Sequence, residues 1–600
     1  MRKKIGAALI LLGTILIVGI IVANTKVPVW KAHALEVVAA AKHARTNLHA
    51  WEIVLEDAKD IPSIYPFSVV KKSLRTAHQI IGHLHGIQAE LTFFPDEYQE
   101  LPKEISHKKI EDIYELIKKI DQKIKTLQKH VQSLPEDFMD PDQKLEIQDF
   151  QKKIQEISAN VSDFKNTHSI FKYLSRNQER VLILLQNQNE PRSTGGFTGS
   201  VVVLDFNPDS VTWRFSDIYS LDRRVPIHQQ KPAPQFFHDL SGTLSLRDAN
   251  FWPDFPTSSQ AYRDFFDIIG EKVPGTVIAI NLNLVEEILH LTGPIKLEKW
   301  GLKLDEYNFD LMLSFLVESK IAGRFNVKYP VLNFAAELFM PIYWRNINLE
   351  TLTDFNFEKF KETKTVLASS TYPPLQKLFD NWNIAGRVQK NKDADNVLHF
   401  DFVSVGANKS EKFVWTKINH DSKVHPSGKV LNTLQLKRTH ALHPGEIQTL
   451  LNADQWSENI RDLIQPELLW KLGEGQNRTV LRIYVPLDAQ IISFENPSGP
   501  LAETFSEDGQ FRIFVLPMFV NVGETLNIKL SYETGNKQGN YHWQPYYLQL
   551  IGTPGRQKTS FLSTISTPEN GNFIADTPNI GRPQNLIDDA FRATVEFRSK

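Results

Sequence analysis

The residues best suited to chemistry lie in a polar loop, 186–199, with the sequence QNQNEPRSTGGFTG. The loop contains one arginine, Arg192, followed closely by Gly195 and Gly196. A guanidinium group binds phosphate oxygens through paired, charge-assisted hydrogen bonds, and glycines leave backbone N–H groups open to an anion. The pattern therefore predicts a phosphate or pyrophosphate site. The alternative interpretation is a structural turn held by a salt bridge.

Further charged residues follow the loop and extend this candidate site. Arg223, Arg224 and Arg247 would complete a cationic cluster. Asp248 and Asp254 carry hard oxygen ligands, which suit Mg²⁺ if a diphosphate shares the coordination shell. The same two aspartates would also serve as cap and turn residues before a helix, or as partners of the arginines.

The elements that must position these residues are strands and helices in alternation. Two apolar runs, Val181–Leu185 and Val201–Leu204, flank the loop and predict buried strands. A helix is expected from Pro256, a buried strand over Val273–Asn281, and a second helix over Leu284–Leu291. This order predicts an α/β domain over residues 171–345.

Three motifs give this region a resemblance to a bacterial family known as domain of unknown function 4012. They are the run 186–197, the sequence RDANFWPDFPTS at 247–258, and TGP at 292–294. The resemblance covers roughly Asn177–Ile295, and GANKS at 406–410 resembles the family's carboxy-terminal half. The family label names no reaction.

A more remote similarity, to LytR-CpsA-Psr domains, concerns the order of the elements. A strand ends in polar residues and an arginine, another closes on FNP at 206–208, LDRR follows at 221–224, and a later strand covers 277–281. The resemblance implies a bacterial envelope transferase that moves a glycopolymer from an isoprenoid pyrophosphate carrier onto the cell wall. That chemistry uses arginines, an aspartate and a magnesium ion.

The same resemblance assigns roles to individual residues. Arg192 takes the place of that family's first arginine, and Arg223 or Arg224 takes the place of the later one. Phe197 and Gly199 stand where an arginine and the catalytic aspartate are expected, so the sequence departs from the transferase mechanism.

The N-terminus predicts a membrane anchor over residues 1–25. Three basic residues, 2–4, precede the uncharged apolar segment Ile5–Ala23, which is long enough to cross a hydrocarbon core of about 30 Å. Because positive charge stays cytoplasmic, the bulk of the chain is expected outside the cytoplasm. A cleaved signal peptide is the alternative, since residues 22–24 resemble a cleavage region.

Composition is consistent with a large multidomain α+β ectodomain. The chain has 600 residues, of which 41% are hydrophobic, and it has no cysteine, so disulfides and thiolate metal sites are excluded. The formal net charge of -2 provides no basic field, which argues against binding to nucleic acid.

The segment after the anchor, 26–170, is expected to be a helical stalk or bundle. Heptad-spaced isoleucines and other apolar residues over 110–131 and 147–164 predict two helices, and prolines between them favour an antiparallel hairpin. One interpretation of this pattern is a coiled coil that acts as a spacer or binds a partner. The other is that these apolar residues form the core of the bundle itself.

The C-terminal part is expected to be β-rich. After a helical connector, 346–395, alternating segments predict an antiparallel β-sandwich over 396–565 and a loosely ordered tail over 566–600. An aromatic strand, 542–547, would either stack on sugars or pack inside the sandwich.

Together these observations lead to two hypotheses about function. The first is a membrane-anchored envelope protein that binds an anionic cell-wall glycan or its polyprenyl-linked pyrophosphate precursor, with transfer as a further step. The second is a non-catalytic scaffold or surface-assembly protein. Arginines converging on an apolar tunnel would favour the first, and arginines buried in salt bridges would favour the second.

Overall fold

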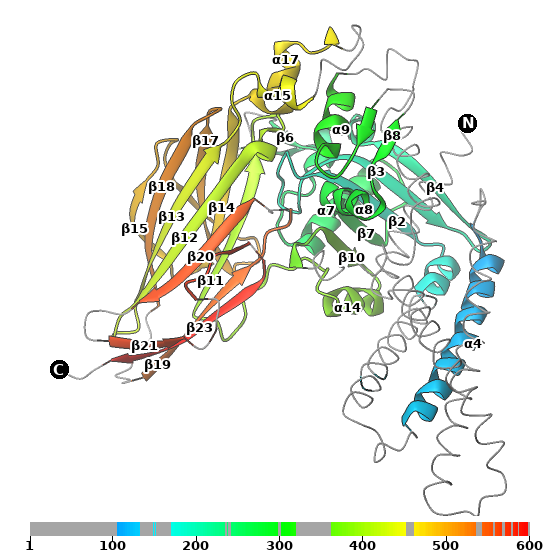
Figure 1. The fold of residues 1–600 in the computed structure, drawn as a ribbon, viewed down its shortest axis with the longest axis horizontal. Helices are drawn as coiled ribbons and strands as arrows, with labels where there is room; N and C mark the ends of the chain where they lie inside the picture. Colours follow the sequence, from blue (N-terminus) through cyan, green and yellow to red (C-terminus); the bar gives the residue numbers. More distant parts are fainter. Residues whose placement is uncertain are drawn as a thin grey trace, which may run out of the picture.

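The computed structural model describes residues 105–132, 148, 151, 168, 170–234, 237, 242–297, 302–319, 362–451, 461–535, 543–555, 558–566, 571–575, 577, 580–585 and 587–597. The chain has mixed α/β content with several sheets (Figure 1). Across these residues, no helix is both long and apolar enough to span a membrane. The predicted anchor, 1–25, lies outside them.

The first long helix coincides with the first of the two helices predicted between residues 110 and 164. Helix α4 (His107–Gln132) covers the heptad-spaced segment, and Ile124, Leu127 and Val131 on one face are buried. Tyr114 of α4 stacks on His168, with 3.6 Å between ring centroids. The second predicted helix, 147–164, falls almost wholly outside the described residues, so the proposed hairpin stays a prediction.

A six-stranded mixed sheet forms the centre of the α/β domain. Its order is β1 (Ile105–Ser106), β4 (Ser210–Asp217), β3 (Phe197–Phe206), β2 (Arg180–Asn187), β7 (Thr276–Asn281) and β10 (Val366–Ser370). Among these described strands, only β2 and β7 pair in parallel, and the other neighbours are antiparallel. The predicted strands on either side of the polar loop are β2 and β3.

Alternation along β2 builds two cores, one on each face of the sheet. Val181 and Ile183 belong to one apolar cluster, while Leu182 and Leu184 belong to the other. Successive side chains of a strand point to opposite faces, so a strand with both sets apolar must be covered on both sides. The unbroken apolar run in the sequence therefore specifies a three-layer arrangement.

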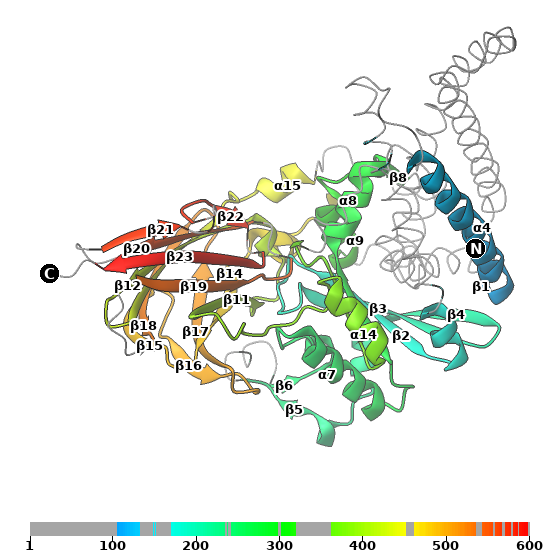
Figure 2. The same cartoon turned by 90° about the horizontal axis from the view of Figure 1, so that it is seen from below.

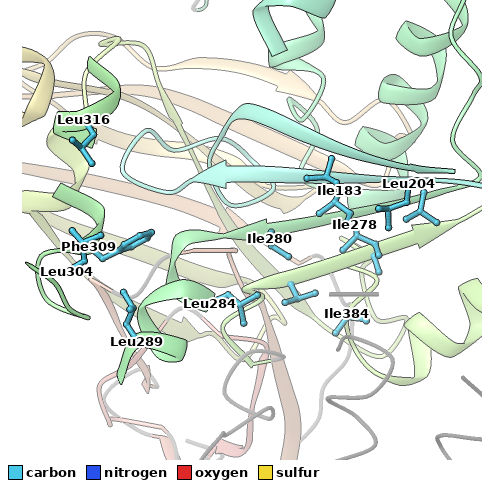
Figure 3. Close-up of a cluster of buried hydrophobic side chains, with 14 of the residues drawn as sticks. Ile183, Leu204, Ile278, Ile280, Leu284, Leu289, Leu304, Phe309, Leu316 and Ile384 are labelled. Atoms are coloured by element: carbon cyan, nitrogen blue, oxygen red, sulfur yellow. The ribbon is translucent and has the colours of Figure 1, made fainter. Parts of the chain in front are cut away.

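Helices cover both faces. Helix α7 (Phe255–Ile268) packs on one face, and α8 (Leu282–Thr292) with α9 (Phe309–Glu318) packs on the other. Figure 3 shows the core on the α8 side of the sheet, in which Leu284 of α8 lies beside Ile280 of β7 and Leu289 of α8 lies near Phe309 of α9.

The predicted helical connector, 346–395, is only partly helical where the structure describes it. Strand β10 lies inside it and pairs antiparallel with β7, with Val366 opposite Ile280. Helix α14 (Pro373–Asn381) follows and buries Leu375 and Phe379. The sequence signal for β10 is five residues long, too short to distinguish a strand from a helical segment by periodicity. This segment therefore completes the central sheet.

The C-terminal region forms a sandwich of two sheets, close to the predicted boundary at Asn396. The first sheet has the order β16 (Ala502–Phe505), β17 (Phe511–Val520), β14 (Asn477–Pro486), β11 (Asn396–Ser404), β19 (Trp543–Ile551), β23 (Asp589–Phe597) and β21 (Gly571–Ala575). The second has β15 (Gln490–Glu495), β18 (Thr525–Thr534), β13 (Val430–His440), β12 (Val414–Val424), β20 (Thr559–Ser566) and β22 (Gln584–Asn585). One apolar cluster fills the space between them.

Two features of this sandwich correct the expectation of an antiparallel fold ending at residue 565. Strand β19 pairs in parallel with β11, and β20 pairs in parallel with β12. Parallel neighbours require a long connection, and here the intervening strands provide it. Strand β23, within the segment expected to be a loose tail, pairs with β19 along its length. Alternation predicts a strand but not its partner's direction, so sequence could not decide either point.

Candidate functional site

The polar loop lies at the end of β2, where the sheet meets the β-sandwich. Two of its glycines have positive φ, +120° at Gly195 and +155° at Gly196. A Cβ on Gly196 would sit 2.3 Å from the backbone of Asn187, so only glycine fits there. A Cβ added to Gly555 of the sandwich would likewise lie 2.8 Å from the carbonyl oxygen of Gly195 in the loop. These glycines thus permit close backbone packing within the loop and across the domain boundary.

Arg192 is buried, with its side chain 4% exposed. Its Nη1 donates hydrogen bonds to the carbonyls of Pro191 (3.0 Å) and Ser404 (3.2 Å). Its Nη2 lies 3.5 Å from a carboxylate oxygen of Glu190 and 3.6 Å from one of Asp248. The guanidinium group is therefore enclosed by internal acceptors.

Aromatic rings close the remaining sides of this arginine. The guanidinium carbon lies 5.4 Å from the ring centroid of Phe197 and 5.3 Å from that of Phe237. Such contacts are attractive for a cation, and they also exclude water. The Nε of Arg192 is the one guanidinium nitrogen with no acceptor in the part of the chain described.

Arg247 and Asp248 lie with Arg192 in one cluster of ion pairs. Arg247 pairs with Asp222 at 2.8 Å, and its Nε lies 3.7 Å from Asp248. Asp248 is 3% exposed, and burial raises its pKa while the charges of Arg192 and Arg247 oppose that rise. Because the carboxylates of Glu190, Asp222 and Asp248 accompany two arginines, this cluster carries no excess positive charge.

Arg224 and Arg223 do not share partners with that cluster. Arg224 donates to Glu271 at 2.7 Å, and the same carboxylate accepts from Arg214 at 2.6 Å and from Arg180 at 3.0 Å. Arg223 is the C-cap of the short helix α6 (Ile218–Asp222) and is exposed. The structure therefore does not gather the four predicted arginines around one ligand position.

Asp254 has a structural role that accounts for both of its oxygens. Its Oδ2 accepts from the backbone N (3.2 Å) and hydroxyl (2.8 Å) of Thr257, capping α7, and its Oδ1 accepts from Val388 N at 3.1 Å. Asp248 lies beside two arginines, and Asp222, the neighbouring carboxylate, is itself paired with Arg247. Across the described residues no cluster of three or more metal-ligating side chains occurs. The two aspartates therefore do not fit a shared magnesium site.

The remaining polar side chains of the loop bond to one another and to the second motif. Gln186 donates to the hydroxyl of Thr194 at 2.7 Å, and Asn250 donates to the same hydroxyl at 3.1 Å and to Gly196 O at 2.8 Å. All of these groups are buried or nearly so. Two of the three motifs that carry the family resemblance, 186–197 and 247–258, are thus joined in one hydrogen-bonded unit.

Sequence reasoning missed the residues through which this unit binds the sandwich. Asp401 of β11 and Arg482 of β14 form a buried ion pair, with side chains 0% and 5% exposed. Arg482 donates to the hydroxyl of Ser193 at 2.7 Å and to Phe251 O at 2.5 Å, and Asp401 accepts from Ser193 at 3.2 Å. Although burial opposes the charge, neighbouring Asp401 raises the pKa of Arg482, which stays protonated.

Further bonds continue this domain seam. Ser404 N donates to Pro191 O at 2.9 Å, and Asn189 donates to Asp310 of α9 at 3.0 Å. Asp310 also forms an ion pair with Lys412, beyond β11 in the chain. No sequence signal marks these partners, because a lone charged residue in a strand has no spacing that indicates what it will face.

The aromatic strand that suggested a sugar platform is β19. Tyr546 is 2% exposed and bonds inside the sandwich, 3.2 Å from Asn396 and 2.9 Å from the hydroxyl of Ser422. It therefore packs and bonds within the sandwich core. The side chains of residues 542–545 lie outside the described set.

This chain thus combines a mixed α/β domain with a β-sandwich, and the buried polar loop joins the two. Residues 177–314 match the model of a family described as "Protein of unknown function (DUF4012)", which supports the predicted relationship to that family over this part of the chain. No curated protein matches the sequence.

Among solved structures, the chain matches a crystal structure described as a "putative protease" from Parabacteroides distasonis ATCC 8503. The identity is 14%, the match covers 31% of this chain and 36% of that one, and the TM-score is 0.15. The chain thus spans about a third of that structure, and at this TM-score the similarity carries no inference about fold or function.

Proposed function

We propose that this protein is a non-catalytic scaffold of the bacterial cell envelope, held at the membrane through residues 1–25, in which the α/β domain and the β-sandwich act as one unit. The observation that carries this proposal is the use of the polar loop. Arg192 and Ser193, the loop residues with the most obvious ligand chemistry, bond instead to Ser404, Asp401 and Arg482.

The rival proposal, recognition of an anionic glycan or an isoprenoid pyrophosphate in the manner of LytR-CpsA-Psr domains, requires arginines open to a ligand. Arg192 is enclosed, and Arg247 is neutralised by Asp222 and Asp248. Replacing internal acceptors by phosphate oxygens would leave those buried carboxylates unpaired, which costs several kcal/mol. The scaffold is therefore the function that the geometry supports best.

Titration with a polyprenyl pyrophosphate, with and without Mg²⁺, tests the proposal. The full-length chain in detergent micelles is compared with Arg192→Ala at equal fractions folded. We expect no saturable binding by either protein. Saturable binding by the wild type that is lost in the variant would overturn the scaffold proposal and place the protein among carrier-lipid handlers.

A further inference from the structure

A large groove lies between the α/β domain and the sandwich, beside the polar seam. Its volume is about 1020 Å³. One wall is formed by residues 251–254, part of the second motif, and the other by residues 502–508 with parts of β14 and β17. Figure 2 shows β16 at the edge of the sandwich, on the side where β5 (Lys231–Pro232), β6 (Thr243–Leu244) and α7 lie.

A smaller cavity adjoins this groove, and residues of both domains line the two spaces together. The indole N–H of Trp252 donates to Glu507 at 2.8 Å, and both residues line the groove and the adjoining cavity of about 200 Å³ along α7. The bridge is exposed and joins the two domains.

The groove has acidic walls. Four carboxylates line it, namely Asp254, Glu503, Glu507 and Asp508, whereas its one lining cation, Arg482, is already paired with buried Asp401. Of the four, Asp254 caps α7 and Glu503 pairs with Arg512 beside the groove. Burial raises the pKa of Tyr484 at the base of the groove, and the charges of Asp508 and Glu507 add to that rise. The negative electrostatic potential of these side chains favours a cationic ligand in the groove and disfavours an anionic glycan.

The groove also runs along a free strand edge. Strand β16 is the outermost strand of its sheet, and no described strand pairs with its outer side. All four of its residues are exposed, and all four line the groove. Because consecutive side chains of a strand point to opposite faces, a groove that touches all four follows the strand's edge and not one of its faces. Unpaired backbone groups at such an edge are a template for another strand.

Aromatic rings complete the recognition surface. Phe505 is 56% exposed, and Arg512 lies 5.2 Å from its ring centroid while pairing with Glu503 at 2.9 Å. Phe505 and Glu503 are two residues apart and share a face of β16. The chain's own arginine thus already shows how a cationic side chain is held there, by a ring and a carboxylate together.

We propose that this groove binds an extended basic peptide segment, which adds a strand to the outer edge of β16 and places lysine or arginine side chains against Glu503, Glu507 and the neighbouring rings. A glycan would use the rings and carboxylates, but it has no backbone N–H and C=O ladder to pair with the strand edge. That this peptide is the partner of a scaffold rests on the proposed function. The binding of the peptide to the groove is measured independently of that function.

The test is fluorescence anisotropy with the full-length chain and a labelled peptide of about eight residues that alternates lysine and threonine. We expect saturable binding that weakens as salt is raised from about 0.05 to about 0.5 M, because exposed charges are screened. The double variant Glu503→Gln, Glu507→Gln keeps hydrogen-bonding side chains but removes both charges. It should weaken binding about tenfold.

Three controls make the outcome decisive. Glu533→Gln, outside the groove on β18, should leave affinity unchanged, and a peptide with N-methyl groups on alternate residues should lose affinity because it cannot pair with β16. Equal binding of the N-methylated peptide, or of the double variant, would overturn the proposal. Saturable binding of an amino-sugar oligomer in place of the peptide would also overturn it and identify a glycan groove.

These results separate the two proposals. Peptide binding by a protein that also binds polyprenyl pyrophosphate through Arg192 would remove the scaffold proposal alone. Failure of the peptide to bind, with no lipid binding either, would remove the groove proposal alone.

Discussion

At the scale of single residues, Arg192 shows how one pattern supports two opposite roles. An arginine followed closely by two glycines can bind a phosphate. It can equally form a structural turn in which the protein's own carboxylates pair with the arginine. The decisive quantities are the 4% exposure of the side chain and the carboxylates of Glu190 and Asp248 within 3.6 Å. Glu190 is a neighbour in the loop, but Asp248 comes from a segment distant in sequence.

Arg192→Ala should destabilise the folded chain by about 3 kcal/mol, because it leaves Asp248 buried beside one fewer cation. Urea unfolding at neutral pH measures this free energy. The matched control is Arg223→Ala, which removes an exposed arginine and should change stability by less than about 0.5 kcal/mol. Equal stability of the two variants would contradict the assignment of Arg192 as a structural residue.

Gly196→Ala should cost about 3 kcal/mol or more, since its Cβ would meet the Asn187 backbone at 2.3 Å and its φ of +155° disfavours other residues. Thermal unfolding compares it with Gly199→Ala in the same segment. The nearest atom to a Cβ on Gly199 is 3.7 Å away, in the Phe197 ring, so this change should be almost neutral. If Gly196→Ala left the melting temperature unchanged, the backbone of Gly196 would not be packed tightly against that of Asn187.

At the scale of elements, Glu271 ties β2, β4 and the loop after α6 together. It follows α7 and accepts from Arg180, Arg214 and Arg224. Burial alone would raise the pKa of Glu271, but hydrogen bonds and charges of these arginines outweigh burial and lower it below 4.5. A lowered pKa means that the folded state favours the carboxylate, so the stabilisation is present above pH 4.5 and is lost as pH falls through the lower folded value.

Glu271→Gln should therefore lower the free energy of unfolding by about 1–3 kcal/mol at pH 7, with a difference from wild type that shrinks steadily below pH 4.5. Chemical denaturation across this pH range measures the difference. Glu287→Gln, on α8 and outside this arginine cluster, serves as the control. A difference that is independent of pH would mean that the charge of Glu271 is not what stabilises this corner.

The sandwich contains a second pH-sensitive feature in two of its buried histidines, His399 and His420. Burial lowers the pKa of both His399 and His420 to about 4, and His420 bonds to Ser563 and Asn432 inside the core. The folded state thus favours neutral imidazole. Stability from each histidine is complete above the unfolded pKa of 6.5 and is lost as pH falls toward 4, by up to about 3 kcal/mol.

His420→Gln should flatten the decline in stability between pH 6.5 and 4, whatever its effect at neutral pH. Denaturant midpoints at several pH values give the slope. His425→Gln changes an exposed histidine and should keep the wild-type slope. An unchanged slope in His420→Gln would show that this residue does not titrate as a buried neutral group.

At the scale of the whole molecule, the domain seam determines whether the protein acts as one unit. Arg482 and Asp401 are buried at its centre, where they face Ser193 and Phe251 of the α/β domain. Breaking such a pair leaves an uncompensated buried charge, at a cost of about 3–5 kcal/mol. Removing this ion pair should therefore weaken the contact that couples the two domains.

Arg482→Met should separate thermal unfolding into two transitions, whereas the wild type should unfold in one. Calorimetry measures this, and a double-mutant cycle with Asp401→Asn should give a coupling energy above about 1 kcal/mol. Arg478→Met, on the same strand but outside this ion pair, provides the comparison. Two transitions already present in the wild type would contradict the single-unit scaffold.

By itself, the sequence determined the local elements. The apolar runs around 181–185, 201–204 and 273–281 specify strands β2, β3 and β7, and Gly293-Pro294 ends α8, because burial periodicity and backbone restrictions are local properties of the chain. The sequence likewise indicated which loop is special. It did not determine the role of Arg192, the parallel pairing of β11 with β19, or the place of β23.

Those features were decided only by the tertiary structure, for a physical reason. Ion pairs, hydrogen bonds and strand partners act over a few ångströms in space, and the partners of this loop, Asp401, Ser404 and Arg482, lie more than two hundred residues away along the chain. The same holds for the acidic groove, since residues 251–254 and 502–508 form one surface only after the two domains meet.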